Sequence, residues 1–191
     1  NTFTLAATVG GTEIALTAGG AADTHTFGVT ELALAQALTN VDTYEILAGK
    51  TLNAAAANLE VTNTIEGAGV LAVRASGDYS PVTISGSVVI DIKDTATATF
   101  SADDVKARTI TQSGTGDATV NIIEATAGTA YDFTGIPSSM TTDLLYIATG
   151  TIAAGTITNW GTIDTVNVTG GASKNYTGNT AIGGGDTITL N

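Results

Sequence analysis

Residues 88–100 read Val-Val-Ile-Asp-Ile-Lys-Asp-Thr-Ala-Thr-Ala-Thr-Phe, and they show the pattern that decides the fold. Two runs, 88–92 and 95–100, are rich in β-branched residues and are separated by Lys93 and Asp94. A β-branched side chain loses little rotamer freedom on a pleated surface, and apolar residues at every second position line one face of a strand. The stretch therefore predicts two short strands joined by a tight turn.

The same pattern extends through most of the chain, in which 37 of 191 residues are threonine and 23 are glycine. Glycine supplies the positive φ angles that tight turns need. Further strand-length runs lie at 24–29, 43–47, 59–65, 70–75, 82–85, 108–111, 118–123, 144–148, 156–158, 162–169 and 187–190. We therefore expect an all-β protein in the main.

Two segments favour short helices instead. Thr30 can cap a helix over residues 31–38, which read Glu-Leu-Ala-Leu-Ala-Gln-Ala-Leu and are good helix formers. Residues 52–59, with four consecutive alanines, are the second candidate. The sequence predicts one or two short helices among the strands.

The N-terminus predicts a hairpin within residues 1–20, with a turn at Gly10 and Gly11. An apolar strand at the end of a chain can pair with a neighbouring molecule, because an open edge offers unpaired backbone groups. The candidate subunit contacts are Phe3, Leu5, Val9, Ile14 and Leu16 in the hairpin, and Ile188 and Leu190 in the last strand.

We searched the sequence for a fixed repeat, because repetition identifies a solenoid. Residues 89–92, 120–123 and 166–169 are similar, but their separations share no unit, and the Thr-x-Thr pairs are also unevenly spaced. This argues against a strict repeat and against a face of stacked Thr-x-Thr pairs that binds ice. The remaining expectations are one domain over residues 1–191, built as an irregular β-solenoid or as a β-sandwich with the N-terminal hairpin.

The composition excludes several classes of function. The net charge is −12, from 18 acidic and 6 basic residues, so the chain lacks the basic surface that binds nucleic acid. Residues 144–163 contain no charged residue over the length of a membrane span, but their threonines and glycines argue against such a span. The chain has no cysteine, which excludes a disulfide framework and thiolate metal sites.

The last third contains a strand-like run at 160–169 that leads into Gly170 and Gly171, and a second Gly-rich turn, 183–185, before Asp186 and the strand 187–190. This text resembles the β-solenoid portions of bacterial surface-layer proteins and of RTX-type secreted proteins. The resemblance implies a secreted bacterial protein at the cell surface or outside the cell, and it makes calcium the candidate cofactor.

The calcium-binding RTX repeat reads Gly-Gly-x-Gly-x-Asp-x-apolar-x, in which carbonyl groups and the aspartate hold the ion. Residues 170–175 have serine at the third glycine and asparagine at the acid, whereas 183–188 keep the acid but are two residues too short. Asp186 is therefore the one candidate metal ligand.

No catalytic site is predicted, and we expect that the protein is not an enzyme. His25 is the single histidine, and a lone histidine in a strand is more often a surface or packing residue than a catalyst. The carboxylate pairs Asp91/Asp94 and Asp103/Asp104 have the residue type used in glycoside hydrolysis, but acidic turns on a solvated rim explain them more simply, because the chain has only 6 basic residues and one Trp with which to bind sugar.

The sequence thus favours a structural subunit of an extracellular array, either a filament or a surface layer, in which identical subunits pair through their terminal strands. The alternative is a calcium-dependent adhesin, or a module of an RTX-like protein that binds a cell-surface glycan.

Overall fold

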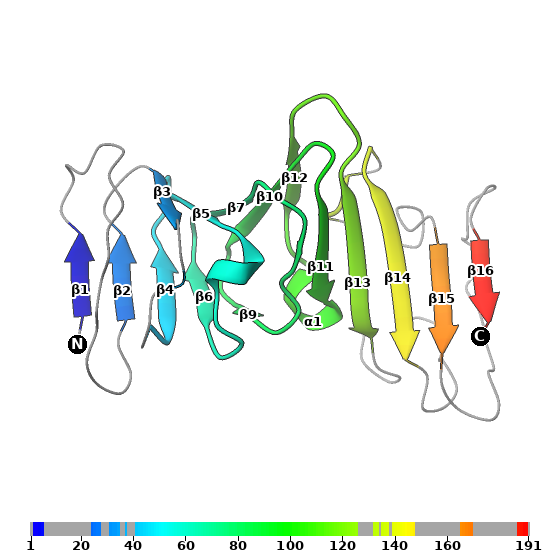
Figure 1. The fold of residues 1–191 in the computed structure, drawn as a ribbon, viewed down its shortest axis with the longest axis horizontal. Coiled ribbons are helices and arrows are strands. Elements are labelled where there is room, and N and C mark those ends of the chain that lie inside the picture. The colour runs from blue at the N-terminus through cyan, green and yellow to red at the C-terminus, as the bar shows by residue number, and fades with distance from the viewer. Residues whose placement is uncertain are drawn as a thin grey trace.

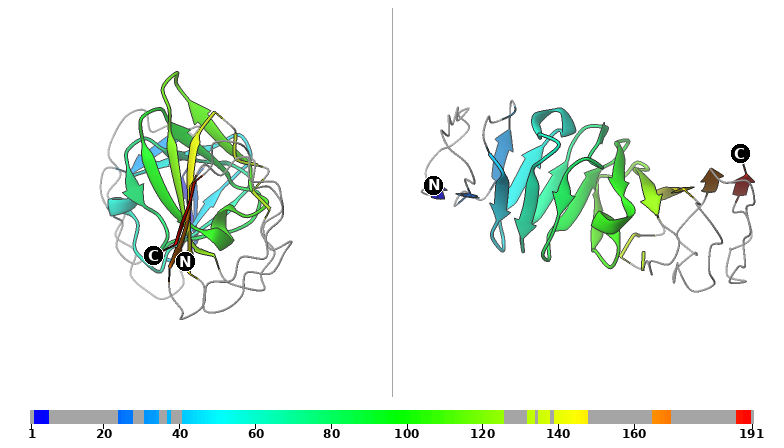
Figure 2. Two further views of the ribbon diagram at one scale, coloured as in Figure 1. Left: turned by 90° about the vertical axis from the view of Figure 1, so that its right-hand side faces the viewer. Right: turned by 90° about the horizontal axis from the view of Figure 1, so that it is seen from below.

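The computed structural model describes residues 2–5, 24–27, 31–34, 37, 41–125, 132–133, 135–137, 139–147, 165–169 and 187–190. These residues form a β-solenoid, in which the chain winds through three sheets and every strand pair is parallel. Figure 1 shows an elongated molecule with β1 (Thr2–Leu5) at one end and β16 (Thr187–Leu190) at the other. In the end view of Figure 2, the coils superpose around one axis. The prediction of a solenoid is confirmed, and the sandwich is excluded.

Each sheet takes one strand from successive coils. Sheet A contains β1, β2 (Thr24–Phe27), β4 (Thr43–Ile46), β6 (Thr64–Gly67) and β9 (Thr83–Ile84). Sheet B contains β3 (Glu31–Leu34), β5 (Thr51–Ala54), β7 (Val70–Val73), β10 (Val89–Lys93) and β12 (Ile110–Ser113). Sheet C contains β8 (Gly77–Asp78), β11 (Thr97–Ser101), β13 (Thr119–Ala125), β14 (Thr141–Ile147), β15 (Thr165–Thr169) and β16. Two short helices, η1 (Ala56–Asn58) and α1 (Ala102–Val105), complete the described elements.

Partner residues in adjacent strands lie 19 to 22 positions apart in the sequence, which is the length of one coil. In sheet C the spacing is 22 for nearly all pairs, so that Ile122, Leu144 and Val166 stand in one column. The similar runs 89–92 and 120–123 belong to different sheets, and the runs 120–123 and 166–169 share sheet C but were compared out of register, since Val166 aligns with Ile122. The solenoid is irregular, as expected, but its coil length varies by only a few residues.

The core fills the inside of the coils, because every second residue of a strand faces the axis. In β4, β5, β10 and β11 buried positions alternate with half-buried or exposed ones. The largest buried side chains include Tyr44, Tyr79 and Phe100, and the rings of Tyr79 and Phe100 stack with centroids 5.3 Å apart. Burial of this inner column supplies the main driving force for folding.

The corner between sheets A and B requires glycine. Gly67 has a φ of +112°, and a Cβ atom there would lie 2.3 Å from the carbonyl oxygen of Ile46. That oxygen accepts hydrogen bonds from the backbone N–H groups of Ala68 and Gly69, both at 2.9 Å. One coil later, Ser87 N–H donates to the carbonyl oxygen of Gly67 at 2.8 Å, so the corners stack as the strands do.

Both predicted helices differ from the structure. Residues 31–34 of the first are strand β3, which pairs with β5 from Glu31 opposite Thr51 to Leu34 opposite Ala54. The second begins as strand β5 and keeps only one turn, η1. In both cases pairing with the neighbouring coil outweighs intrinsic helix propensity, which amounts to less than about 1 kcal/mol per residue.

The predicted N-terminal hairpin lies largely outside the described residues. Its first strand is β1, whose described partner is β2, in parallel. Within the described part of the chain, the helices are too short to cross a membrane.

Candidate assembly edges

The three sheets are staggered along the solenoid axis, and each sheet has an edge strand at both of its ends. We call an edge outer where it lies at an end of the solenoid and inner where it lies toward the middle. Sheet A runs from β1 to β9, and sheet C runs from β8 to β16. The outer edge strands β1 and β16 each have one partner among the described strands, β2 and β15 respectively. Because a strand inside a sheet needs two partners, each offers one side on which no described strand pairs.

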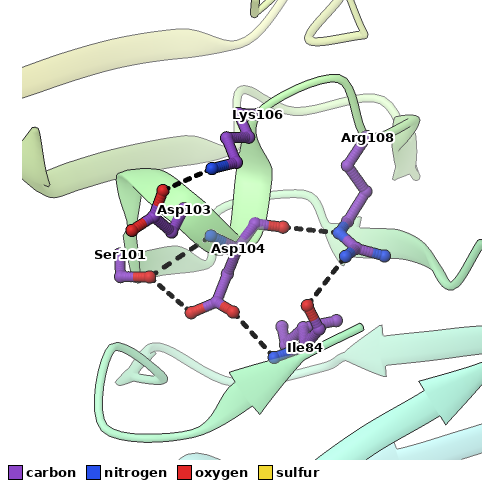
Figure 3. Close-up of polar contacts among 6 residues, drawn as sticks. All are labelled: Ile84, Ser101, Asp103, Asp104, Lys106 and Arg108. Carbon is purple, nitrogen blue, oxygen red and sulfur yellow. Dashed lines mark hydrogen bonds and ion pairs between the residues drawn. The ribbon is translucent and has the colours of Figure 1, made fainter. Parts of the chain in front are cut away.

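The inner edge of sheet A, at β9, is closed by side chains from the following coil. Asp104 Oδ1 accepts a hydrogen bond from Ile84 N–H at 2.7 Å, and Arg108 Nη2 donates to the Ile84 carbonyl oxygen at 2.8 Å (Figure 3). Arg108 Nη1 also donates to the carbonyl oxygen of Val88 at 2.8 Å. Two side chains thus take the place of the strand that would otherwise continue the sheet.

The helix α1 holds this closure in position. Ser101 caps the helix by accepting a hydrogen bond from Asp104 N–H at 3.3 Å, and its hydroxyl donates to Asp104 Oδ2 at 2.5 Å. Arg108 Nε donates to the Asp104 carbonyl oxygen at 2.5 Å, as Figure 3 shows. Burial raises the pKa of Asp104 above its usual range and lowers the pKa of Arg108.

The inner edges of the other two sheets are also covered. At the last strand of sheet B, Ile110 N–H donates to the Gly135 carbonyl oxygen at 2.9 Å, and just before that strand Ala107 N–H donates to Asp132 O at 2.5 Å. At the first strand of sheet C, η1 lies so close to β8 that a Cβ atom on Gly77 would be 2.7 Å from the Cβ of Ala56. A chain segment thus binds the inner edge of sheet B, and η1 lies beside the inner edge of sheet C.

Threonine and other polar residues form columns on the outside of the sheets. In sheet C, Thr97, Thr119 and Thr141 are aligned in successive coils, and Asn121 Nδ2 lies 3.5 Å from Thr99 Oγ1. In sheet A the aligned residues are Thr2, Thr24, Thr43, Thr64 and Thr83. The stacking of whole Thr-x-Thr pairs does not continue along the sheets, because Thr26 stands opposite Glu45 and Thr99 stands opposite Asn121.

The predicted carboxylate pairs are bound in separate structural networks. Asp91 Oδ2 receives a hydrogen bond from Arg74 Nη1 at 2.5 Å, and Asp91 Oδ1 receives one from Thr111 Oγ1 at 2.9 Å. Arg74 Nη1 also donates to Ser113 Oγ at 2.7 Å, so the network joins β10 to β12. Burial works to raise the pKa of Asp91, but the hydrogen bonds from Arg74, Thr111 and Ser113 outweigh it and hold that pKa below its usual value.

The second member of each pair binds elsewhere. Asp94 Oδ2 accepts hydrogen bonds from the backbone N–H groups of Thr115 and Gly116, both at 3.2 Å. Asp103 is exposed and forms an ion pair with Lys106 Nζ at 2.6 Å. These contacts give each of the four carboxylates a structural partner.

The described residues contain no cluster of three or more His, Asp or Glu side chains that could hold a metal ion. Asp186, the predicted calcium ligand, lies outside the described residues, as do Val9, Ile14 and Leu16. Phe3 and Leu5 belong to β1, and Ile188 and Leu190 belong to β16, so these predicted contacts fall on the two outer edge strands.

A groove of about 430 Å³ lies beside β8 and η1. Its lining is mainly apolar and includes Ala56, Leu59 and Val82, with Val61 70% exposed at its side. Asp78 is the one ionisable residue among those that line it, and its Oδ1 accepts hydrogen bonds from the backbone and hydroxyl of Ser80. The groove therefore lacks the set of acid, base and nucleophile that a catalytic site combines.

Sequence reasoning missed the closure of β9. Its local signal was present, because Ser101 followed three residues later by Asp104 has the spacing of a helix N-terminal cap. The role of Arg108 had no such signal, since its acceptors Ile84 and Val88 lie about one coil earlier in the sequence.

The described residues form a parallel β-solenoid in which side chains close sheet A at β9, whereas β1 and β16 have no second partner among the described strands. Comparison with family models, with curated proteins and with solved structures gave no match.

Proposed function

We propose that this chain is a structural subunit of a self-assembling extracellular array, in which identical subunits join end to end by strand pairing. The observation that supports the proposal is the contrast between the edges. At β9, Asp104 and Arg108 occupy the polar groups of Ile84, whereas β1 and β16 each lack a second partner among the described strands.

The composition of the outer edges also supports assembly. Monomeric proteins protect exposed edge strands with charges, prolines or bulges. The strands β1 and β16 read Thr-Phe-Thr-Leu and Thr-Ile-Thr-Leu and contain none of these, although the chain as a whole has a net charge of −12. The strands themselves therefore carry no charge that would oppose pairing with a second copy.

The position of the edges favours a fibre. The two outer edges lie at opposite ends of the solenoid (Figure 1), so one subunit's β16 meets another's β1. Such a contact is heterologous, and it generates an open filament unless the rotation happens to close a ring. Filaments that associate side by side would form a sheet, so the proposal also covers a surface layer.

The role is mechanical and protective, and the setting is the cell surface or the extracellular space. The ion-pair and hydrogen-bond networks around Asp91 and Asp104 stabilise the solenoid in this account and take no part in catalysis.

Electron microscopy of the purified chain in negative stain, with calcium and then with a chelator, tests the proposal. Ordered fibres or sheets in both conditions would support a structural polymer. Polymers that form only when calcium is present would support the array and show that its assembly requires the metal. Dispersed particles in both conditions would reject assembly and favour the calcium-dependent adhesin, which chelator-sensitive thermal melting would then detect.

A further inference from the structure

Several internal strand pairs of sheets A and C share one register. In sheet A, Thr24 stands opposite Thr2 and Thr64 stands opposite Thr43, and in sheet C Thr187 stands opposite Thr165. The following position in each strand carries an apolar or aromatic residue in nearly every case, as in Ile65 opposite Tyr44. In these pairs threonine aligns with threonine, whereas Thr26 stands opposite Glu45, Thr51 opposite Val70 and Thr165 opposite Asp143.

The two outer edge strands have the same sequence pattern. β1 is Thr2-Phe3-Thr4-Leu5, and β16 is Thr187-Ile188-Thr189-Leu190. Both therefore begin with threonine, place a large apolar residue second, and end with leucine. They belong to different sheets and lie at opposite ends of the molecule.

We propose that β16 of one copy pairs in parallel with β1 of a second copy in a single register, with Thr187 opposite Thr2 and Leu190 opposite Leu5. This inference rests on the proposed function and specifies its contact. The second copy is rotated about the solenoid axis, so that its sheet A continues sheet C of the first.

The parallel direction follows from the winding of the chain. All strands of a solenoid run the same way around the axis, as the parallel pairs in all three sheets show. A second copy whose axis points the same way presents β1 with the same sense as β16. The interface is then continuous with the pairing inside each subunit.

Other registers are less favourable. A shift by one residue would place Thr2 opposite Ile188, and it would move the apolar set to the opposite face of the sheet. A shift by two residues keeps the alternation, but only two positions of each four-residue strand would then face each other. The proposed register pairs all four positions of both strands.

The absence of native cysteine makes a disulfide test direct. Directly opposite residues in neighbouring strands are about 4.8 Å apart, within the Cα separation of about 4.4–6.8 Å that a disulfide requires. The double variant Thr4→Cys/Thr189→Cys has its cysteines in the proposed register. The control Thr2→Cys/Thr189→Cys is displaced by two residues, which gives roughly 8 Å and exceeds that limit.

Both variants are assembled, inspected by electron microscopy, mildly oxidised and run on a denaturing gel without reductant. We expect a ladder of covalent oligomers from the first variant, and at least tenfold less cross-linking from the control and from each single-cysteine variant. Fibres without cross-links in the first variant, or with equal cross-links in the control, would overturn the register and leave the structural subunit intact. A chain that forms no assembly at all would overturn both.

Discussion

Asp104 and Arg108 bind the two polar groups of one residue, Ile84, which lies in the last strand of sheet A. The carboxylate accepts from Ile84 N–H at 2.7 Å, and the guanidinium donates to the Ile84 carbonyl oxygen at 2.8 Å. The same guanidinium reaches the carbonyl oxygen of Val88. The two side chains therefore supply the hydrogen-bond acceptor and donor that the backbone of a further strand would supply, and the sheet ends there.

Replacement of Arg108 by methionine should destabilise the solenoid. The change keeps an apolar stem but leaves carbonyl oxygens at Ile84 and Val88 without their donor, at an expected cost of about 3 kcal/mol. Urea unfolding followed by circular dichroism measures the effect. Lys106→Met is the matched control, because its exposed ion pair with Asp103 contributes no more than about 1 kcal/mol. Equal losses in the two variants would show that Arg108 does not close the sheet.

Asp104→Asn should change how stability depends on pH. Burial raises the pKa of Asp104 in the folded state, so the folded protein holds the proton more tightly than the unfolded chain. The stabilisation that protonated Asp104 gives to the folded state is fully present below the usual aspartate pKa. It is lost as pH rises through the higher folded pKa. The asparagine variant should therefore gain stability relative to the wild type as pH increases, measured by urea unfolding at several pH values. A constant difference would contradict this assignment.

Asp91→Asn should have the opposite pH dependence. Hydrogen bonds from Arg74, Thr111 and Ser113 lower the pKa of Asp91, so its stabilisation is present above the usual aspartate pKa and is lost as pH falls through the lower folded pKa. We expect a loss of about 1 kcal/mol at neutral pH, which diminishes in strong acid. The same urea series measures it, and a loss that grows in acid would refute the argument.

Gly67→Ala should be much more costly than Gly49→Ala. Both glycines have a positive φ, but a Cβ on Gly67 would meet the carbonyl oxygen of Ile46 at 2.3 Å, whereas the space around Gly49 is open. Gly49→Ala should cost about 1 kcal/mol from backbone strain, and Gly67→Ala should cost at least about 3 kcal/mol because the corner must also move. Thermal melting of the two variants compares them directly, and similar melting temperatures would show that the corner adapts.

Much of the solenoid could be predicted from local sequence. Most strand-length runs became strands within a few residues of the expected bounds, including residues 187–190 and the two runs around Asp94. The alternation of apolar and polar residues indicates that every second residue of a strand is buried, and it can be read from the sequence of that strand alone. Of the predicted subunit contacts, two lie in β1 and two lie in β16.

What the sequence did not predict depends on contacts about one coil apart. Residues 31–34 have helix-forming composition, yet Glu31 pairs with Thr51 and Leu34 with Ala54. The coil length also escaped detection, since Val89 and Val120 belong to different sheets and their separation carries no repeat. Propensity and spacing along one segment cannot report which residues the winding brings together.

The last prediction tests the edge contact through charge. Because Thr4 and Thr189 would stand opposite each other between copies, Thr4→Lys/Thr189→Lys should place like charges together at every contact, at a cost of about 1 kcal/mol. The critical concentration for assembly, measured by sedimentation, should rise about fivefold. Thr4→Lys/Thr189→Glu brings the same lysine opposite a carboxylate and should restore assembly at low salt, with the advantage reduced as salt screens the pair. Equal critical concentrations for the two variants would show that these positions do not meet. A general loss of solubility or folding could not explain rescue by the opposite charge.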